Sequence, residues 1–151
     1  MTVIWIDADA CPLVIKEIIF RASKRLQVAI KMVANQFISH PKSALIEMVI
    51  VPKTFDAADA YIVLHVVAKD LVITADIPLA ASVVEKGAIA INPRGEVYTH
   101  ENAKVQLSVR NFMHDMRGAG LVTSYTPALN KIDMQKFAAA FDKHLTKKLA
   151  E

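Results

Sequence analysis

The sequence has little cysteine and little glycine, and it contains no long apolar run. Its single cysteine, Cys11, cannot form an internal disulfide, so we expect a protein of the reducing cytoplasm. No apolar stretch approaches the ~18 residues that a membrane span requires, so we expect no membrane association. Only 4 glycines and 54% hydrophobic residues are typical of a folded chain rather than a disordered one.

Strong charge of one sign is also missing. The net charge of +3 permits an anionic partner without requiring one. The five histidines are scattered without metal-ligand spacing, and no phosphate-binding cysteine motif surrounds Cys11, which we expect to be a buried free thiol. A length of 151 residues predicts a single domain over residues 1–151. Aspartate is left as the residue type whose placement is most informative.

Strand-like and helix-like segments alternate along the first two thirds of the chain. The apolar run 3–6 ends at Asp7 and Asp9, and Pro12 then suits the first turn of a helix. Further strands are expected at 28–34, 46–51, 71–74 and 88–91, with a short extra one at 97–98. This order predicts an α/β fold, a mostly parallel sheet of about five strands with helices on both faces and extra C-terminal helices.

Five aspartates stand at or beside predicted helix starts in three strand–helix units. They are Asp7, Asp9, Asp56, Asp59 and Asp76. A parallel sheet would bring all of them to its carboxyl edge, where ligands of such sheets bind. Crowded carboxylates repel one another unless a proton or a cation intervenes, and Mg²⁺ or Mn²⁺ prefers such oxygen ligands. We therefore predict a metal site built from these five residues, the alternative being that each caps its own helix. Asp70, in contrast, is expected to be a solvent-exposed turn residue.

Two arginines are candidates for holding a substrate phosphate. Arg94 follows the fifth predicted strand near the same sheet edge, and Arg110 lies on the helix predicted over 101–117. The planar guanidinium suits phosphate oxygens, although an exposed arginine or a salt bridge to the acidic cluster would explain Arg110 equally well. No interleaving of aromatic residues indicates a stacking platform for single strands.

Four segments closely resemble the bacterial YaiI/YqxD family, in order and over nearly the whole chain. They are residues 4–12, 56–62, 71–80 and 93–96. That family is similar to PIN and NYN domains, which are metal-dependent ribonucleases with a Rossmann-like sheet. The resemblance implies a three-layer Rossmann-like fold in which Asp7 ends the first strand, Asp56 or Asp59 is the mid-domain acid, and Asp76 follows the fourth strand.

The same resemblance implies a nuclease that hydrolyses phosphodiester bonds with Mg²⁺ or Mn²⁺ and prefers RNA. Asp7, Asp9, Asp59 and Asp76 would be the catalytic residues, and Asn35 would join Arg94 and Arg110 in binding substrate. Ile77 and Pro78 stand where many NYN domains have a second acid and an aromatic residue. The number of metal ions therefore stays open, as does the oligomeric state.

Two other functions fit parts of the sequence. The Asp7-x-Asp9 pair after an apolar strand resembles the nucleophile and acid–base pair of haloacid-dehalogenase-type phosphatases. Those enzymes need a later lysine and a terminal acidic pair, and no such order follows Asp76. The second alternative is a non-catalytic module that binds nucleic acid or protein, since a fold alone does not imply an activity.

Overall fold

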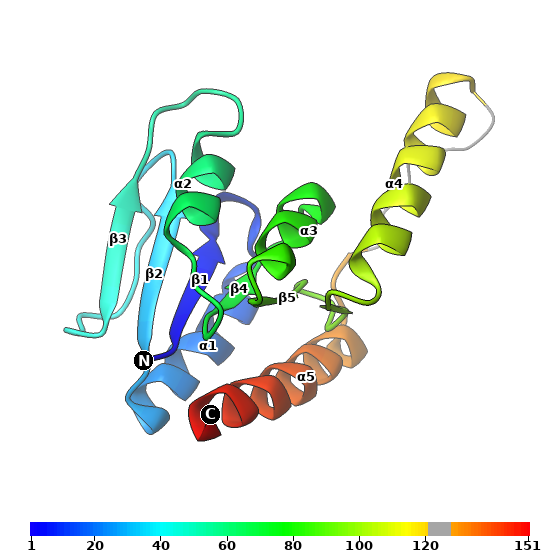
Figure 1. The fold of residues 1–151 in the computed structure, drawn as a ribbon. Helices are drawn as coiled ribbons and strands as arrows, with labels where there is room; N and C mark the ends of the chain where they lie inside the picture. The colour runs from blue at the N-terminus through cyan, green and yellow to red at the C-terminus, as the bar shows by residue number, and fades with distance from the viewer. Residues whose placement is uncertain (121–127) are drawn as a thin grey trace.

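The computed structural model describes residues 1–120 and 128–151 and contains a six-stranded sheet (Figure 1). In chain order its strands are β1 (Val3–Asp7), β2 (Ala29–Ala34), β3 (Ile46–Ile50), β4 (Leu71–Ile73), β5 (Ile89–Ile91) and β6 (Val97–Tyr98). Their spatial order is β3-β2-β1-β4-β5-β6, and every pairing is parallel except that of β6 with β5.

Helices cover both faces of this sheet. The helices of the described chain are the short 3₁₀ helix η1 (Ala8–Ala10), α1 (Leu13–Leu26), α2 (Ala57–His65), α3 (Ile77–Glu85), α4 (Ala103–Gly118) and α5 (Lys131–Ala150). The side chains of α1 and α5, among them Ile19 and Phe141, form one core with the sheet. Those of α2 and α3, among them Ile62 and Leu79, form the other. The predicted three-layer Rossmann-like α/β fold is therefore confirmed.

The alternation of side chains along β1 decides which face receives the first aspartate. Ile4 and Ile6 belong to the core beneath α1 and α5, whereas Trp5 belongs to the core beneath α2 and α3. Successive strand residues point to opposite faces, so Asp7 falls on the same side as Trp5. The last residue of β1 is thereby directed towards α2 and α3.

The neighbouring strands β1 and β4 form the switch point of the sheet. From β1 the strand order runs outward through β2 to β3, and then returns to β4 on the other side of β1. In open α/β sheets a crevice lies outside the carboxyl ends of the two strands at such a point. Residues that follow β1 and β4 in sequence therefore meet there.

Asp70 is buried, and the prediction of a solvent-exposed turn residue is wrong. Only 2% of its surface is exposed, and its carboxylate accepts hydrogen bonds from Val3 N, Trp5 Nε1 and Val67 N. These bonds join the amino ends of β1 and β4, at the opposite edge of the sheet from the five aspartates of the predicted metal site.

No helix among the described residues is long and apolar enough to cross a membrane.

Candidate metal and substrate site at the carboxyl edge of the sheet

A hydrogen-bonded chain crosses the switch point between β1 and β4. Asp7, at the end of β1, is buried, and its Oδ2 accepts a hydrogen bond of 3.0 Å from the hydroxyl of Thr74. The same hydroxyl oxygen accepts a hydrogen bond of 3.0 Å from the backbone N–H of Asp76. Thr74 follows β4 directly, so the parallel register of Ile6 with Ile73 places it opposite Asp7. Thr74 was not among the predicted site residues, because its place opposite Asp7 follows from the pairing of β1 with β4.

Asp76 begins α3 and also faces α2. Its Oδ1 accepts a hydrogen bond of 3.0 Å from Leu79 N, and Pro78 occupies the first turn of the helix. The Asp76 carboxylate lies close enough to that of Asp59, in the first turn of α2, for the two to share a hydrogen bond. Helix capping therefore explains one function of Asp76, but it does not explain why a second carboxylate approaches it.

Burial and neighbouring negative charge raise the pKa values of two carboxylates at this edge, Asp59 and Asp7. Burial raises the pKa of Asp59 to about 7, together with the charges of Asp76 and Asp7, the hydrogen bond with Asp76 and the charge of Asp56. Burial also raises the pKa of Asp7; the Thr74 hydrogen bond opposes that increase, and the charges of Asp76 and Asp9 add to it. Near neutral pH this group of side chains therefore retains a proton or attracts a cation.

Asp9 and Asp56 lie at the exposed periphery of the group. The Oδ2 of Asp9, in η1, accepts a hydrogen bond of 2.9 Å from the backbone N–H of Asn35. Asp56 precedes α2 with a φ of 62°, and within the described chain its side chain makes no capping hydrogen bond to that helix. The capping alternative thus accounts for Asp76 but not for Asp56.

Two cavities open beside the aspartates and share part of their lining. The smaller, of about 300 Å³, is lined by residues that include Asp9, Asn35, Asp56, Asp59 and Asp76. The larger, of about 580 Å³, shares the last three aspartates and extends to Arg110 on α4. The structure therefore brings Asn35 and Arg110 to the carboxyl edge of the sheet where the five aspartates lie, which we call the acidic edge.

A third cavity, of about 700 Å³, lies between α1 and α5. Asp142 and two arginines line it, but none of the five aspartates does, so it is the weaker candidate for the site.

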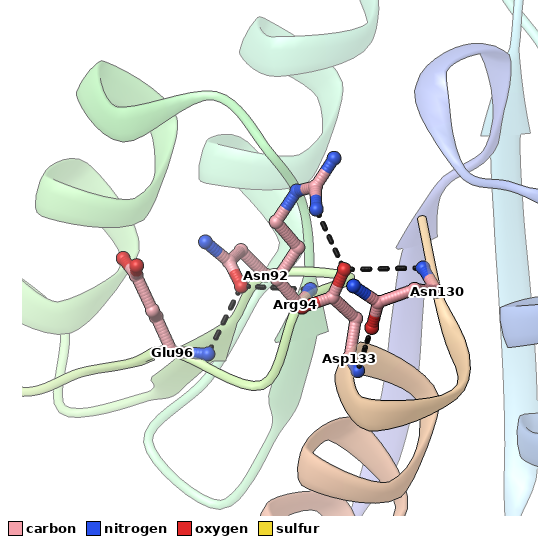
Figure 2. A network of polar contacts seen from close by, with 5 residues as sticks. All are labelled: Asn92, Arg94, Glu96, Asn130 and Asp133. Atoms are coloured by element: carbon pink, nitrogen blue, oxygen red, sulfur yellow. Dashed lines mark hydrogen bonds and ion pairs between the residues drawn. The ribbon is translucent and has the colours of Figure 1, made fainter. Parts of the chain in front are cut away.

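Arg94 lies outside the lining of both cavities in the described part of the chain and contacts the start of α5 instead (Figure 2). Its Nη1 lies 2.7 Å from Oδ2 of Asp133 at the start of α5, and neither cavity, as the described residues form it, includes Arg94. Asp133 and Asn130 form a capping box at the beginning of α5, so this carboxylate belongs to a helix terminus. Arg94 therefore pairs with a carboxylate away from both cavities, and its predicted contact with a substrate phosphate stays a prediction.

The acidic edge fits a hydrated divalent cation better than a cation enclosed by protein ligands. Among the described residues, no group of three or more His, Cys, Asp or Glu side chains is arranged to hold a metal ion. Asp59 and Asp76 form a close pair, and Mg²⁺ is often bound by one or two carboxylates together with water and substrate phosphates. Two carboxylates are therefore in position, and the five-ligand site stays a prediction.

Cys11 is not poised as a nucleophile. The thiol is buried at the end of η1, and burial raises its pKa to about 12. Because the thiolate is the reactive form, this thiol is unreactive near neutral pH. The expectation of a buried free cysteine is confirmed.

Fold and site together define a Rossmann-like α/β protein with a carboxylate cluster at the switch point of its sheet. The chain belongs to the YaiI/YqxD family: residues 5–147 match the family described as "Uncharacterized BCR, YaiI/YqxD family". A UPF0178 protein of Bordetella avium is 51% identical over 148 residues, which is 98% of this chain and 96% of that protein. One from Shewanella sp. (strain MR-4) is 54% identical over 144 residues, 95% and 96% of the two chains. No solved structure matches the sequence.

Proposed function

We propose that this protein is a metal-dependent nuclease that hydrolyses phosphodiester bonds at the carboxyl edge of its sheet. The observation that carries the proposal is the close approach of Asp59 and Asp76, at the wall that two open cavities share. Near neutral pH such a pair retains a proton or attracts a cation, and both carboxylates line cavities that can admit a substrate. The preference for RNA rests on the family's resemblance to PIN and NYN domains.

Each side chain has a distinct role in this proposal. Asp59 and Asp76 would hold Mg²⁺ or Mn²⁺. Asp7, hydrogen-bonded to Thr74, and Asp9, hydrogen-bonded to Asn35 N, would provide further direct or water-bridged ligands. The cation, when bound, supplies an acidified water and offsets the negative charge of the phosphate. Asp56 adds negative charge at the cavity wall and would hold water near the cation.

Arg110 is the residue that we assign to the substrate phosphate. It lies on the wall of the larger cavity, which Asp59 and Asp76 also line. Its guanidinium can donate two parallel hydrogen bonds to phosphate oxygens and so hold the scissile bond beside the carboxylates. Arg94 receives no role in the reaction, because its guanidinium pairs with Asp133.

Cleavage of end-labelled RNA in Mn²⁺ or Mg²⁺ tests the proposal, with three proteins purified in parallel. Asp76→Asn removes the charge but keeps an oxygen that can cap α3, and we expect its activity to fall at least roughly 100-fold. Asp115→Asn, an exposed change on α4, should cleave like the wild type. EDTA should abolish cleavage by every protein.

Other outcomes would favour other functions. Equal cleavage by Asp76→Asn and the wild type would identify a contaminating nuclease. Hydrolysis of p-nitrophenyl phosphate without RNA cleavage, lost in Asp7→Asn, would favour the phosphatase, for which the Thr74 hydroxyl beside Asp7 is a suitable neighbour. RNA binding with no hydrolysis in any metal would favour the non-catalytic module.

A further inference from the structure

Phe55 is an exposed aromatic residue at the mouth of the acidic edge. It stands in the connection between β3 and α2, directly before Asp56, and 94% of its surface is exposed. An aromatic side chain normally gains from burial, so one left almost wholly in water at a cavity is a candidate contact. Phe55 lines both cavities that Asp59 and Asp76 share.

The larger of these cavities combines three kinds of lining. Phe55 contributes an aromatic face, Asp59 and Asp76 contribute carboxylates, and Arg110 contributes a cation from α4. Its volume of about 580 Å³ lies in the usual range for small-molecule sites. A nucleotide carries the matching parts, a flat base and a phosphate.

We propose that Phe55 is the stacking platform for one unpaired base of a single-stranded nucleic acid, and that Arg110 contacts a phosphate beside it. The inference rests on the proposed nuclease function and narrows its substrate to an unpaired strand. A stacked aromatic side chain needs a free face of the base, which a continuous duplex does not offer. In Figure 1, α4 extends in the direction in which the arrowheads of β1 and β3 point, and Arg110 on this helix lines the larger cavity.

The position of Phe55 distinguishes it from another exposed phenylalanine. Phe37 is 66% exposed, but its ring contacts the ring of His40 at 5.7 Å between centroids. Neither of the two cavities, within the described part of the chain, is lined by Phe37. Phe37→Ala therefore removes the same side chain from a place where we expect no base, and it is the matched control.

The test measures binding of a fluorescein-labelled oligouridylate about ten nucleotides long by fluorescence anisotropy, in Ca²⁺ and again in EDTA. Phe55→Ala should weaken binding roughly ten-fold, whereas Phe37→Ala should stay within about two-fold of the wild type. Annealing the probe to oligoadenylate forms a duplex without unpaired bases, and this should also weaken wild-type binding roughly ten-fold. Equal affinity of Phe55→Ala and the wild type, or no binding by the wild type, would overturn the inference.

Phe55→Trp provides an independent readout. The single native tryptophan, Trp5, is buried, so the new side chain would be the exposed fluorophore. We expect the oligouridylate to bind this variant and to quench its fluorescence, because a base stacks on the indole. Binding without quenching would contradict stacking, even if Phe55→Ala failed to fold.

Comparison with the cleavage assay separates the two proposals. If RNA is cleaved and Phe55→Ala changes neither affinity nor cleavage, the nuclease function stands and the stacking platform is refuted. If Phe55→Ala loses affinity and no variant cleaves RNA, the stacking platform stands and hydrolysis is refuted.

Discussion

The pKa of Asp59 differs strongly from the ordinary value of an aspartate. Burial and the neighbouring aspartates raise its pKa from the ordinary 3.8 to about 7. Between these two pH values the folded protein keeps a proton that the unfolded chain releases. A raised pKa of this kind stabilises the fold fully below about pH 4, and the contribution is lost as the pH rises towards 7.

The pH dependence of stability tests this reading of Asp59. In EDTA, the free energy of unfolding of the wild type should fall between about pH 4 and pH 7 relative to that of Asp59→Asn, which carries no ionisable group there. Urea denaturation of both proteins over a pH series measures the difference. A difference that is independent of pH would show that the carboxylates do not interact as described.

Asp70 shows the opposite use of a carboxylate, as a buried structural acceptor. Asp70→Ala leaves three donors of the β1 and α2–β4 regions without their partner, and it should lower the free energy of unfolding by roughly 3 kcal/mol. Asp115→Ala, an exposed change, should stay within ~0.5 kcal/mol of the wild type. Equal stability of the two variants in urea would mean that water replaces the carboxylate at little cost.

The turn between β5 and β6 anchors the C-terminal helix. The side chain of Asn92 accepts hydrogen bonds from Arg94 N and Glu96 N, at 2.9 Å and 3.0 Å, and Arg94 reaches Asp133 in α5 (Figure 2). Gly95 has a φ of 90°, and a Cβ atom there would lie 2.6 Å from the backbone carbon of Lys136. The turn therefore requires glycine for both its conformation and its contact with α5.

Substitution of this glycine should loosen the attachment of α5. We expect Gly95→Ala to lower the free energy of unfolding by roughly 2 kcal/mol or more, because the added methyl group meets main-chain atoms at a positive φ. Gly118→Ala is the control, since a Cβ there meets no described atom within 4 Å; it should be neutral or stabilising by up to ~1 kcal/mol. Thermal unfolding of both variants measures the difference. Equal melting temperatures would contradict the requirement for glycine at position 95.

Apolar runs and helically spaced apolar residues predicted the strands and helices, because β1, β2, β4 and β5 are largely buried and α1 and α5 each bury a set of apolar side chains. They gave no indication that α2 ends at His65. Val66 is extended there, and the Asp70 carboxylate accepts a hydrogen bond from Val67 N. That contact depends on the packing of β4 against β1, which no local pattern contains.

For the candidate site, the sequence predicted the location of the aspartates but not the contacts between them. Aspartates at strand ends could be assigned to one edge of a parallel sheet, but their pairing could not. The approach of Asp59 to Asp76 depends on how α2 packs beside α3, and the partner of Arg94 depends on the docking of α5. Phe55 carries no local signal at all, because its exposure follows from the path of the β3–α2 connection.

The arrangement of the whole chain explains why the carboxylates gather at one place. The strand order positions β1 and β4 side by side, α2 and α3 cover the face to which Asp7 points, and α4 adds Arg110 across the larger cavity. Negative charge therefore accumulates at the switch point, and among the described residues Arg110 is the cation that lines the larger cavity. Burial alone would disfavour such a group of carboxylates, so a cation that binds there should stabilise the folded protein.

Binding of Mn²⁺, followed by the decrease of the free-ion electron paramagnetic resonance signal at neutral pH, tests the central claim most directly. The account predicts that the wild type and Asp115→Asn bind Mn²⁺ with equal affinity, and that Asp59→Asn and Asp76→Asn bind it at least roughly ten-fold more weakly. Mn²⁺ should also raise the melting temperature of the first two proteins only. Equal Mn²⁺ affinity in all four proteins, or none in the wild type, would contradict a metal site at the paired carboxylates.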